Sequence, residues 1–287
     1  MLTPELLHLA RIIELSARKK AQQSISGQFQ SAFQGEGLEF NEVRPYYPGE
    51  DTRRIDWNVS ARSGSPYIKT FFEDRNIHII IAVDISSSMK FGSQQKSKAD
   101  VAMEITSLLL LLGAIHKHKT SLLAFSEEID LYLPVKPGKA EVLRALTKLV
   151  AVTAARKRTL KTDYQKTVHF LQNIVKKRGI LFFISDYLQL DRAEALVTLR
   201  KKLKLNIFHI RDSLEERLNS QGLGGAYMLS DLENNHYQPL RKGASGLETA
   251  RLSSVYPSEY LSVYADQFHL KELMKYFNNR QHFHKAI

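Results

Sequence analysis

Residues Ile77–Met89 read IHIIIAVDISSSM, an almost unbroken apolar run that ends abruptly in an acid and a cluster of hydroxyls. A run of this kind is typical of a strand buried on both faces of a parallel sheet. Asp84, Ser86 and Ser88 then lie in the loop at the carboxyl end of that strand, where α/β sheets bind ligands. Three hard oxygen donors in one short loop suit Mg²⁺, with Mn²⁺ or Ca²⁺ as substitutes. Taken alone, the same residues also fit ordinary capping of a following helix.

The composition is that of a globular protein. The chain has 287 residues, of which 43% are hydrophobic and 25% charged, enough for a sizeable core. It has no cysteine, which excludes disulfides, thiolate metal sites and cysteine nucleophiles. Residues 1–5 lack the basic and apolar regions of a signal peptide, and no apolar stretch reaches about 18 residues. We therefore expect a cytoplasmic protein, or one held at the inner membrane through its partners.

The positive charge is concentrated in one segment. The net charge is +11, and residues 136–178 alone hold 12 Lys and Arg against Glu141 and Asp163. This segment predicts a surface for nucleic acid, anionic lipid or an acidic protein, unless it is simply a solvated helix face. Its few aromatic residues, chiefly Tyr164 and Phe170, disfavour base stacking.

Strand and helix patterns alternate from residue 77 onward, which predicts a doubly wound, mostly parallel α/β sheet. Three parts are expected: an N-terminal extension over 1–75, with a helix over 4–23 and a small loop and β module; an α/β domain over 76–235; and a C-terminal helical extension over 236–287. Strands are predicted over 67–74, 77–84, 120–125, 129–133, 180–185, 205–210 and 227–230. Helices are predicted over 94–117, 139–150, 164–177, 191–203, 212–218 and 256–277.

Two further polar positions belong to the same predicted edge as Asp84. Thr162 precedes a predicted helix, and Asp186 follows a buried strand. Because parallel strands end on one side of a sheet, three loops can place Ser86, Thr162 and Asp186 around one ion. Neutral hydroxyls leave such an ion partly uncompensated, so that it can accept a carboxylate from a partner.

A dense segment precedes the first buried strand, with arginines and acids around the only tryptophan. Arg44, Arg53, Trp57 and Arg62 can form an internal network of ion pairs and stacking. The alternative is an exposed partner-binding surface, since arginine and tryptophan are common at interface hot spots.

These residues resemble two known patterns. Asp84, Ser86 and Ser88, with Thr162 and Asp186, are similar to the metal-ion-dependent adhesion site (MIDAS) of von Willebrand factor type A domains; Thr159 is a rival to Thr162. The string from Glu39 to Arg62 resembles the bacterial "domain of unknown function 58" family. The resemblance implies a type A-like domain that binds Mg²⁺ and acts with a MoxR-type AAA+ ATPase as an adaptor or chaperone-like component. Many members of that family carry N-terminal membrane helices.

The predicted function is therefore a non-enzymatic, Mg²⁺-dependent protein-binding module. The alternative is a basic protein that binds nucleic acid or an anionic surface through residues 136–178. A metal-dependent hydrolase stays open because an ion with free positions can activate water. The sequence holds neither a P-loop nor a G-x-S-x-G motif, and His116/His118 and His282/His284 lack a third ligand for zinc.

Overall fold

The computed structural model describes most of the chain from residue 38 onward. The described residues are 38–50, 52–73, 78–93, 96–155, 161–175, 178–188, 193–214, 217, 228–230, 237–239, 252–267, 272–273 and 275–277. The helix predicted over 4–23, the rival Thr159 and the pair His282/His284 lie outside these residues.

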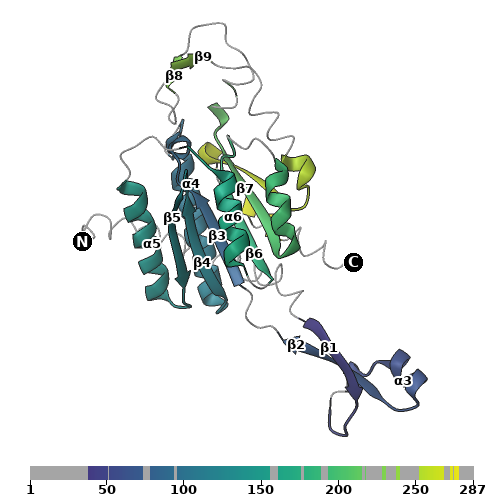
Figure 1. Ribbon diagram of the computed structural model, residues 1–287. Coiled ribbons are helices and arrows are strands. Elements are labelled where there is room, and N and C mark those ends of the chain that lie inside the picture. Colours follow the sequence, from purple (N-terminus) through teal and green to yellow (C-terminus); the bar gives the residue numbers. More distant parts are fainter. Residues whose placement is uncertain are drawn as a thin grey trace.

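A six-stranded sheet forms the centre of the molecule, with the strand order β10-β7-β6-β3-β4-β5 (Figure 1). Neighbouring strands run parallel except β5, which is antiparallel to β4. The strands are β3 (His78–Asp84), β4 (Lys119–Phe125), β5 (Ile129–Val135), β6 (Gly179–Ser185), β7 (Leu203–Arg211) and β10 (Tyr260–Tyr264). The sheet is thus mixed but mostly parallel, and the predicted α/β class is confirmed.

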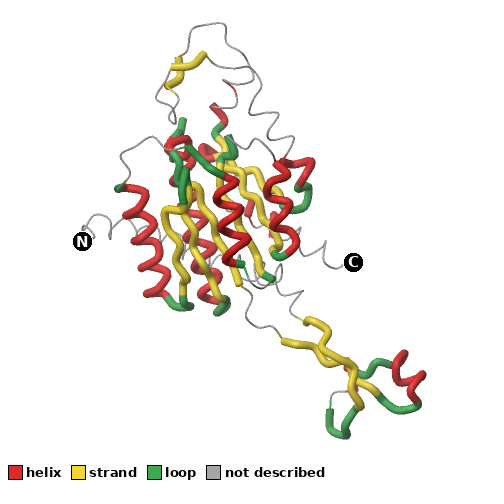
Figure 2. Tube along the Cα trace, in the orientation of Figure 1, coloured by secondary structure: helices red, strands yellow, loops and turns green. Residues whose placement is uncertain are grey.

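Helices cover both faces of this sheet (Figure 2). The alternate residues Ile79, Ile81 and Val83 of β3 pack in one core with α4 (Lys98–Ile115) and α5 (Lys139–Ala154). Ile80 and Ala82 pack in the other core with α6 (Tyr164–Ile174) and the 3-10 helix η4 (Ala193–Lys201). Since β3 is buried on both faces, its apolar run has no polar alternation.

Local sequence explains where the central helix begins. The Ser97 hydroxyl accepts from the Asp100 backbone N–H and the Asp100 carboxylate accepts from the Ser97 N–H, so a capping box starts α4 at Lys98. The loop before it contains η3 (Ser87–Lys90). A side chain at Gly92 would collide with the backbone of Lys96 and Ser97, so this loop needs glycine there.

The N-terminal module lies apart from the sheet in Figure 1. It consists of β1 (Leu38–Pro45) and β2 (Tyr67–Glu73), paired antiparallel, with η2 (Thr52–Arg54) and α3 (Trp57–Ser63) between them. Only residues 74–77 separate β2 from β3, so the module lies beyond the amino ends of the parallel strands.

The C-terminal part differs from the prediction. Helices were expected over 256–277, but Tyr260–Tyr264 is a strand that pairs in parallel with β7 and extends the main sheet. Tyr256, Tyr260 and Tyr264 are spaced four residues apart, as on one face of a helix, yet aromatic and β-branched residues also suit a strand edge.

The strand expected over 227–230 is β8 (Met228–Ser230), which pairs with β9 (Tyr237–Pro239) in a separate sheet. In the described part of the chain, no helix is long and apolar enough to cross a bilayer.

We expect Leu110→Ala to lower the free energy of unfolding by about 2–5 kcal/mol, because Leu110 is fully buried in α4 and its loss leaves a cavity. Urea unfolding measures this change. The control is Ile115→Ala at the end of the same helix, where the side chain is 54% exposed and the expected change is within about 0.5 kcal/mol. Equal losses in the two variants would contradict this account of the core.

Candidate functional site

The oxygen-rich residues gather at the carboxyl edge of the two central strands. Asp84 ends β3, and Asp186 directly follows its neighbour β6. Thr162 comes from the loop before α6 and donates from Oγ1 to Asp84 Oδ2 at 3.1 Å. The hydroxyls of Ser86 and Ser88 lie 3.1 Å apart. All five predicted side chains are buried here, and three separate segments contribute them.

Backbone contacts fix the loops that carry these side chains. The N–H of Ser86 donates to Asp84 Oδ1 at 2.8 Å, which closes the turn after β3. The N–H of Asp163 donates to the carbonyl of Ser126, tying the second loop to the end of β4. Asp163 then caps α6 through the N–H of Lys166, so Thr162 is held just before the first turn.

Two carboxylates share this buried space. Burial and the nearby charge of Asp186 raise the pKa of Asp84 from 3.8 to about 6, although hydrogen bonds from Ser185 and Ser86 act in the opposite direction. The folded protein therefore favours the protonated acid more than the unfolded chain does. A cation near these oxygens would offset the burial of the ionised carboxylate.

Sequence reasoning missed Ser185 and Tyr164. Ser185 donates from Oγ to Asp84 Oδ2 at 2.6 Å, and the Tyr164 hydroxyl lies 2.8 Å from the same Oγ. Burial, together with the charge of Asp84, raises the pKa of Tyr164 well above 10, so its hydroxyl stays protonated and donates. Ser185 carried a sequence signal, as a hydroxyl at a strand end beside Asp186. The role of Tyr164 depends on which face of α6 meets the sheet.

Lys98 was missed as well. Its ammonium lies 2.9 Å from Asp186 Oδ2, and both side chains are almost completely buried. The other oxygen, Asp186 Oδ1, accepts from the N–H of Leu188 at 3.3 Å. The sequence gives no signal for this pair, since a lysine in the first turn of a helix is usually solvated.

The residue after Asp186 has an unusual backbone. Tyr187 has φ of 55°, in the left-handed region that large residues rarely adopt, and its side chain is fully buried. Its ring stacks on Tyr164 with centroids 5.9 Å apart, and its hydroxyl donates to the carbonyl of Phe183. Such a conformation persists only where packing enforces it, and it is concentrated at functional sites.

The donor set fits a hard divalent cation. Two carboxylates and the hydroxyls of Ser86, Ser88 and Thr162 converge, and after pairing with Lys98 the cluster keeps one excess negative charge. Among the described residues, no three His, Asp or Glu side chains are placed to hold a metal, so an ion here would depend on hydroxyls. Mg²⁺ tolerates this because it keeps several waters and takes few protein ligands.

The arginines and tryptophan predicted to bind a partner lie on the N-terminal module, away from this edge. Arg44 forms a two-armed ion pair with Glu50, at 3.0 and 2.5 Å, and its guanidinium lies over the ring of Tyr47. These contacts of Arg44 with Glu50 and Tyr47 are of the kind predicted for an internal network of ion pairs and stacking. They do not enclose Trp57, which is 69% exposed at the start of α3. Arg53 and Arg62 are exposed too.

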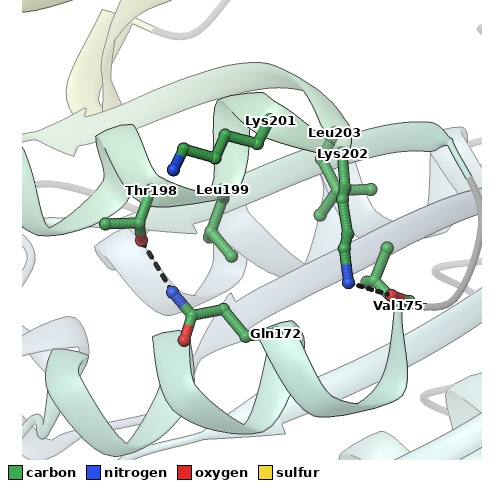
Figure 3. A pocket seen from close by; sticks show the side chains of 7 residues that line it. All are labelled: Gln172, Val175, Thr198, Leu199, Lys201, Lys202 and Leu203. Carbon is green, nitrogen blue, oxygen red and sulfur yellow. Dashed lines mark hydrogen bonds between the residues drawn. The ribbon is translucent and has the colours of Figure 1, made fainter.

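A separate pocket of about 360 Å³ lies between α6 and η4, next to the amino end of β7 (Figure 3). The Gln172 amide donates to Thr198 Oγ1 at 2.9 Å and the Lys202 ammonium to the carbonyl of Val175 at 3.3 Å. The surface that faces the pocket is mostly apolar. The residues that line it are Gln172, Val175, Thr198, Leu199, Lys201, Lys202 and Leu203. The lining has neither a carboxylate nor a histidine, and the pocket lies at the strand end opposite Asp84.

The fold and this edge define the class of the protein: an α/β domain whose mixed, mostly parallel six-stranded sheet carries buried acids and hydroxyls at its carboxyl edge. Within that class, the chain belongs to the family described as "Protein of unknown function DUF58", which matches residues 42–246. The family resemblance seen in the sequence is thereby confirmed.

Among the similar curated proteins are two that are named as uncharacterized. One from Mycobacterium tuberculosis (strain H37Rv) and one from Mycobacterium bovis are each 26% identical to this chain over 185 residues. The aligned part covers 64% of this chain and 58% of each relative.

Solved structures with a similar arrangement include type A domains. BatB from Bacteroides thetaiotaomicron matches with a TM-score of 0.42 and 14% identity, over 74% of this chain and all of that one. The VWA domain of SpRpn10 matches with a TM-score of 0.33 and 14% identity, over 58% of this chain and 98% of that one. A von Willebrand factor type A protein from Catenulispora acidiphila matches with a TM-score of 0.34 and 10% identity, over 74% of this chain and 43% of that one. The fold assignment itself rests on the strand order and connections described above.

In metal-free buffer, we expect the wild type to lose stability relative to Asp84→Asn as the pH rises from about 4 to about 6. Asp84 has an ordinary pKa of 3.8 in the unfolded chain and about 6 in the folded protein, so the folded state binds more protons within this window. Deprotonation there favours unfolding. Urea unfolding with chelator, at several pH values, measures the difference between the two proteins. A difference that stays constant across the window would contradict the raised pKa.

Proposed function

We propose that this protein is a non-enzymatic binding module that holds Mg²⁺ at Asp84, Ser86 and Ser88, with Thr162 and Asp186 contributing directly or through water. Mn²⁺ or Ca²⁺ could take the same place. The observation that carries the proposal is the convergence of donors from three segments on one buried carboxylate: Ser86, Thr162 and Ser185 all contact Asp84. Capping of a single helix requires no such convergence.

The chain's own residues define what the site would bind. Ser86, Ser88 and Thr162 are neutral, so they orient an ion without neutralising it. The ion would supply an open coordination position with excess positive charge. An Asp or Glu side chain of a partner protein best fills the open position and balances the charge, because it adds a hard oxygen and a negative charge.

The family supports a partner class. The resemblance of this chain to the family implies that it acts with a MoxR-type AAA+ ATPase, as an adaptor or chaperone-like component in the cytoplasm. Arg53, Trp57 and Arg62 on the N-terminal module, with Arg44 held by Glu50, would form a second contact surface. Exposed aromatic and arginine side chains are favoured at interface hot spots.

The basic segment 136–178 supports the alternative, a binder of nucleic acid or anionic surfaces, less well. Its described helical basic residues lie on α5 and α6, which pack in two different cores on opposite faces of the sheet. Lys139 and Arg144 thus belong to one face and Lys166 to the other, so these described residues do not share one surface.

We expect Mg²⁺ to stabilise the wild type against urea, by about 3 kcal/mol at 100 times its dissociation constant. Asp84→Ala should abolish this effect, and Ser88→Ala should weaken it while keeping both carboxylates. Glu141→Ala, on the surface of α5, is the control and should respond like the wild type. If Mg²⁺ changes no unfolding midpoint, the proposed site is wrong.

Partner binding should follow the same pattern. With a MoxR-type ATPase from the same organism, affinity should fall at least about tenfold with chelator or in Ser88→Ala. The alternative predicts indifference to chelator and a steep dependence on salt. Interferometry at two salt concentrations, with and without chelator, distinguishes the two functions.

We expect Trp57→Ala to weaken binding of that ATPase by about 2 kcal/mol, as loss of an exposed aromatic hot-spot residue does. Its stability should change by less than about 0.5 kcal/mol because the ring is mostly exposed. Asn58→Ala, the exposed next residue of α3, is the control. Unchanged affinity in Trp57→Ala would exclude the module as a contact surface.

A further inference from the structure

A buried lysine beside the proposed cation site is the feature that the proposed function leaves unused. The Lys98 ammonium is fully buried and lies 2.9 Å from Asp186 Oδ2, with Phe91 beneath it at 5.8 Å from the ring centroid. Buried lysines are rare unless they are paired, and an isolated ion pair inside a protein is seldom worth its desolvation. An ion pair at this position therefore calls for an explanation beyond stability.

The loop before α4 fixes the position of the ammonium. The N–H of Lys98 donates to the carbonyl of Phe91 at 2.8 Å, and Ser93 donates twice to Asp212 Oδ2, which follows β7. The same loop begins with Ser86 and Ser88. The backbone of Lys98 is thus tied to the segment that follows the proposed ligands Ser86 and Ser88.

The pair changes the chemistry of Asp186. One oxygen of Asp186 is engaged by Lys98, and the other accepts from the backbone N–H of Leu188. The Lys98 ammonium at Asp186 Oδ2 repels a cation and competes with it for that oxygen, so the paired carboxylate is a weaker direct ligand than an unpaired one. The pair also sets the charge: Asp84, Asp186 and Lys98 together carry one negative charge, so a divalent ion would leave the site with one positive charge. Without Lys98 the loaded site would be neutral.

We propose that Lys98 is a specificity-determining residue of the site: it withholds Asp186 from direct coordination and keeps the cation-loaded site positively charged, so that it selects an anionic ligand. This inference rests on the proposed function. The protein would bind its cation more weakly in exchange for stronger binding of a carboxylate from the partner.

The test compares charge variants by Mn²⁺ binding, followed by electron paramagnetic resonance and calorimetry. Lys98→Met should bind Mn²⁺ at least about tenfold more tightly than the wild type, because a unit charge within a few ångströms acts strongly at an effective dielectric near 20. Lys98→Arg keeps the charge and should stay within about threefold of the wild type. An affinity in Lys98→Met equal to or weaker than the wild type's would overturn the proposal.

A double variant tests the role of Asp186 and protects against misfolding, since Lys98→Met leaves a buried carboxylate unpaired. Lys98→Met/Asp186→Asn keeps the wild-type net charge and should bind Mn²⁺ within about threefold of the wild type. A tenfold loss would show that Asp186 is a direct ligand and would overturn the proposal.

Ligand selection is measured with acetate as the probe, by water proton relaxation of the Mn²⁺-loaded proteins. Acetate should bind Mn²⁺-loaded Lys98→Met at least about threefold more weakly than the loaded wild type, and equal binding would contradict the charge argument. Failure of the proposed function gives a different result: neither the wild type nor any variant would bind Mn²⁺.

Discussion

The buried carboxylate of Asp84 is the point on which the described structure at the sheet edge depends. Its two oxygens accept from the backbone of Ser86, the hydroxyl of Thr162 and the hydroxyl of Ser185, so three loops meet through one side chain. Removing such an acid leaves several donors unsatisfied in a buried space. The same contacts that fix the loops also arrange hydroxyl oxygens around an uncompensated negative charge. Structural support and potential for binding therefore come from the same atoms.

The parallel sheet makes this meeting possible. β3 and β6 are neighbours with aligned registers, so Asp84 and Ser185 end adjacent strands although they are 101 positions apart. The helix α4 returns the chain from the end of β3 to the start of β4, and α6 leads to the start of β6, which leaves the carboxyl ends of β3 and β6 to loops. The N-terminal module, which carries Trp57, instead joins the sheet at the amino end of β3. The two proposed contact surfaces thus belong to different parts of the chain, the carboxyl edge of the main sheet and the N-terminal module.

Some of the site could not be predicted because charge pairing in a core depends on three-dimensional placement. Lys98 begins a helix with an ordinary capping box, and nothing local distinguishes it from a solvated lysine. Only the packing of α4 against β3 brings its ammonium to Asp186. Tyr164 likewise meets Ser185 because one face of α6 covers the sheet. The strand Tyr260–Tyr264 was misassigned for a related reason, since pairing with β7 overrides a spacing that also fits a helix.

The α/β class, the buried strand that ends at Asp84 and the polar residues at the strand ends could all be predicted from local sequence patterns. This was possible because an uninterrupted apolar run followed by acids and hydroxyls is a local pattern with few structural solutions. Tertiary structure alone decided the sixth strand, the exposure of Trp57 and the partners of the two acids. Those features depend on contacts between segments far apart in the chain, and such contacts follow from packing and charge compensation rather than from neighbouring residues.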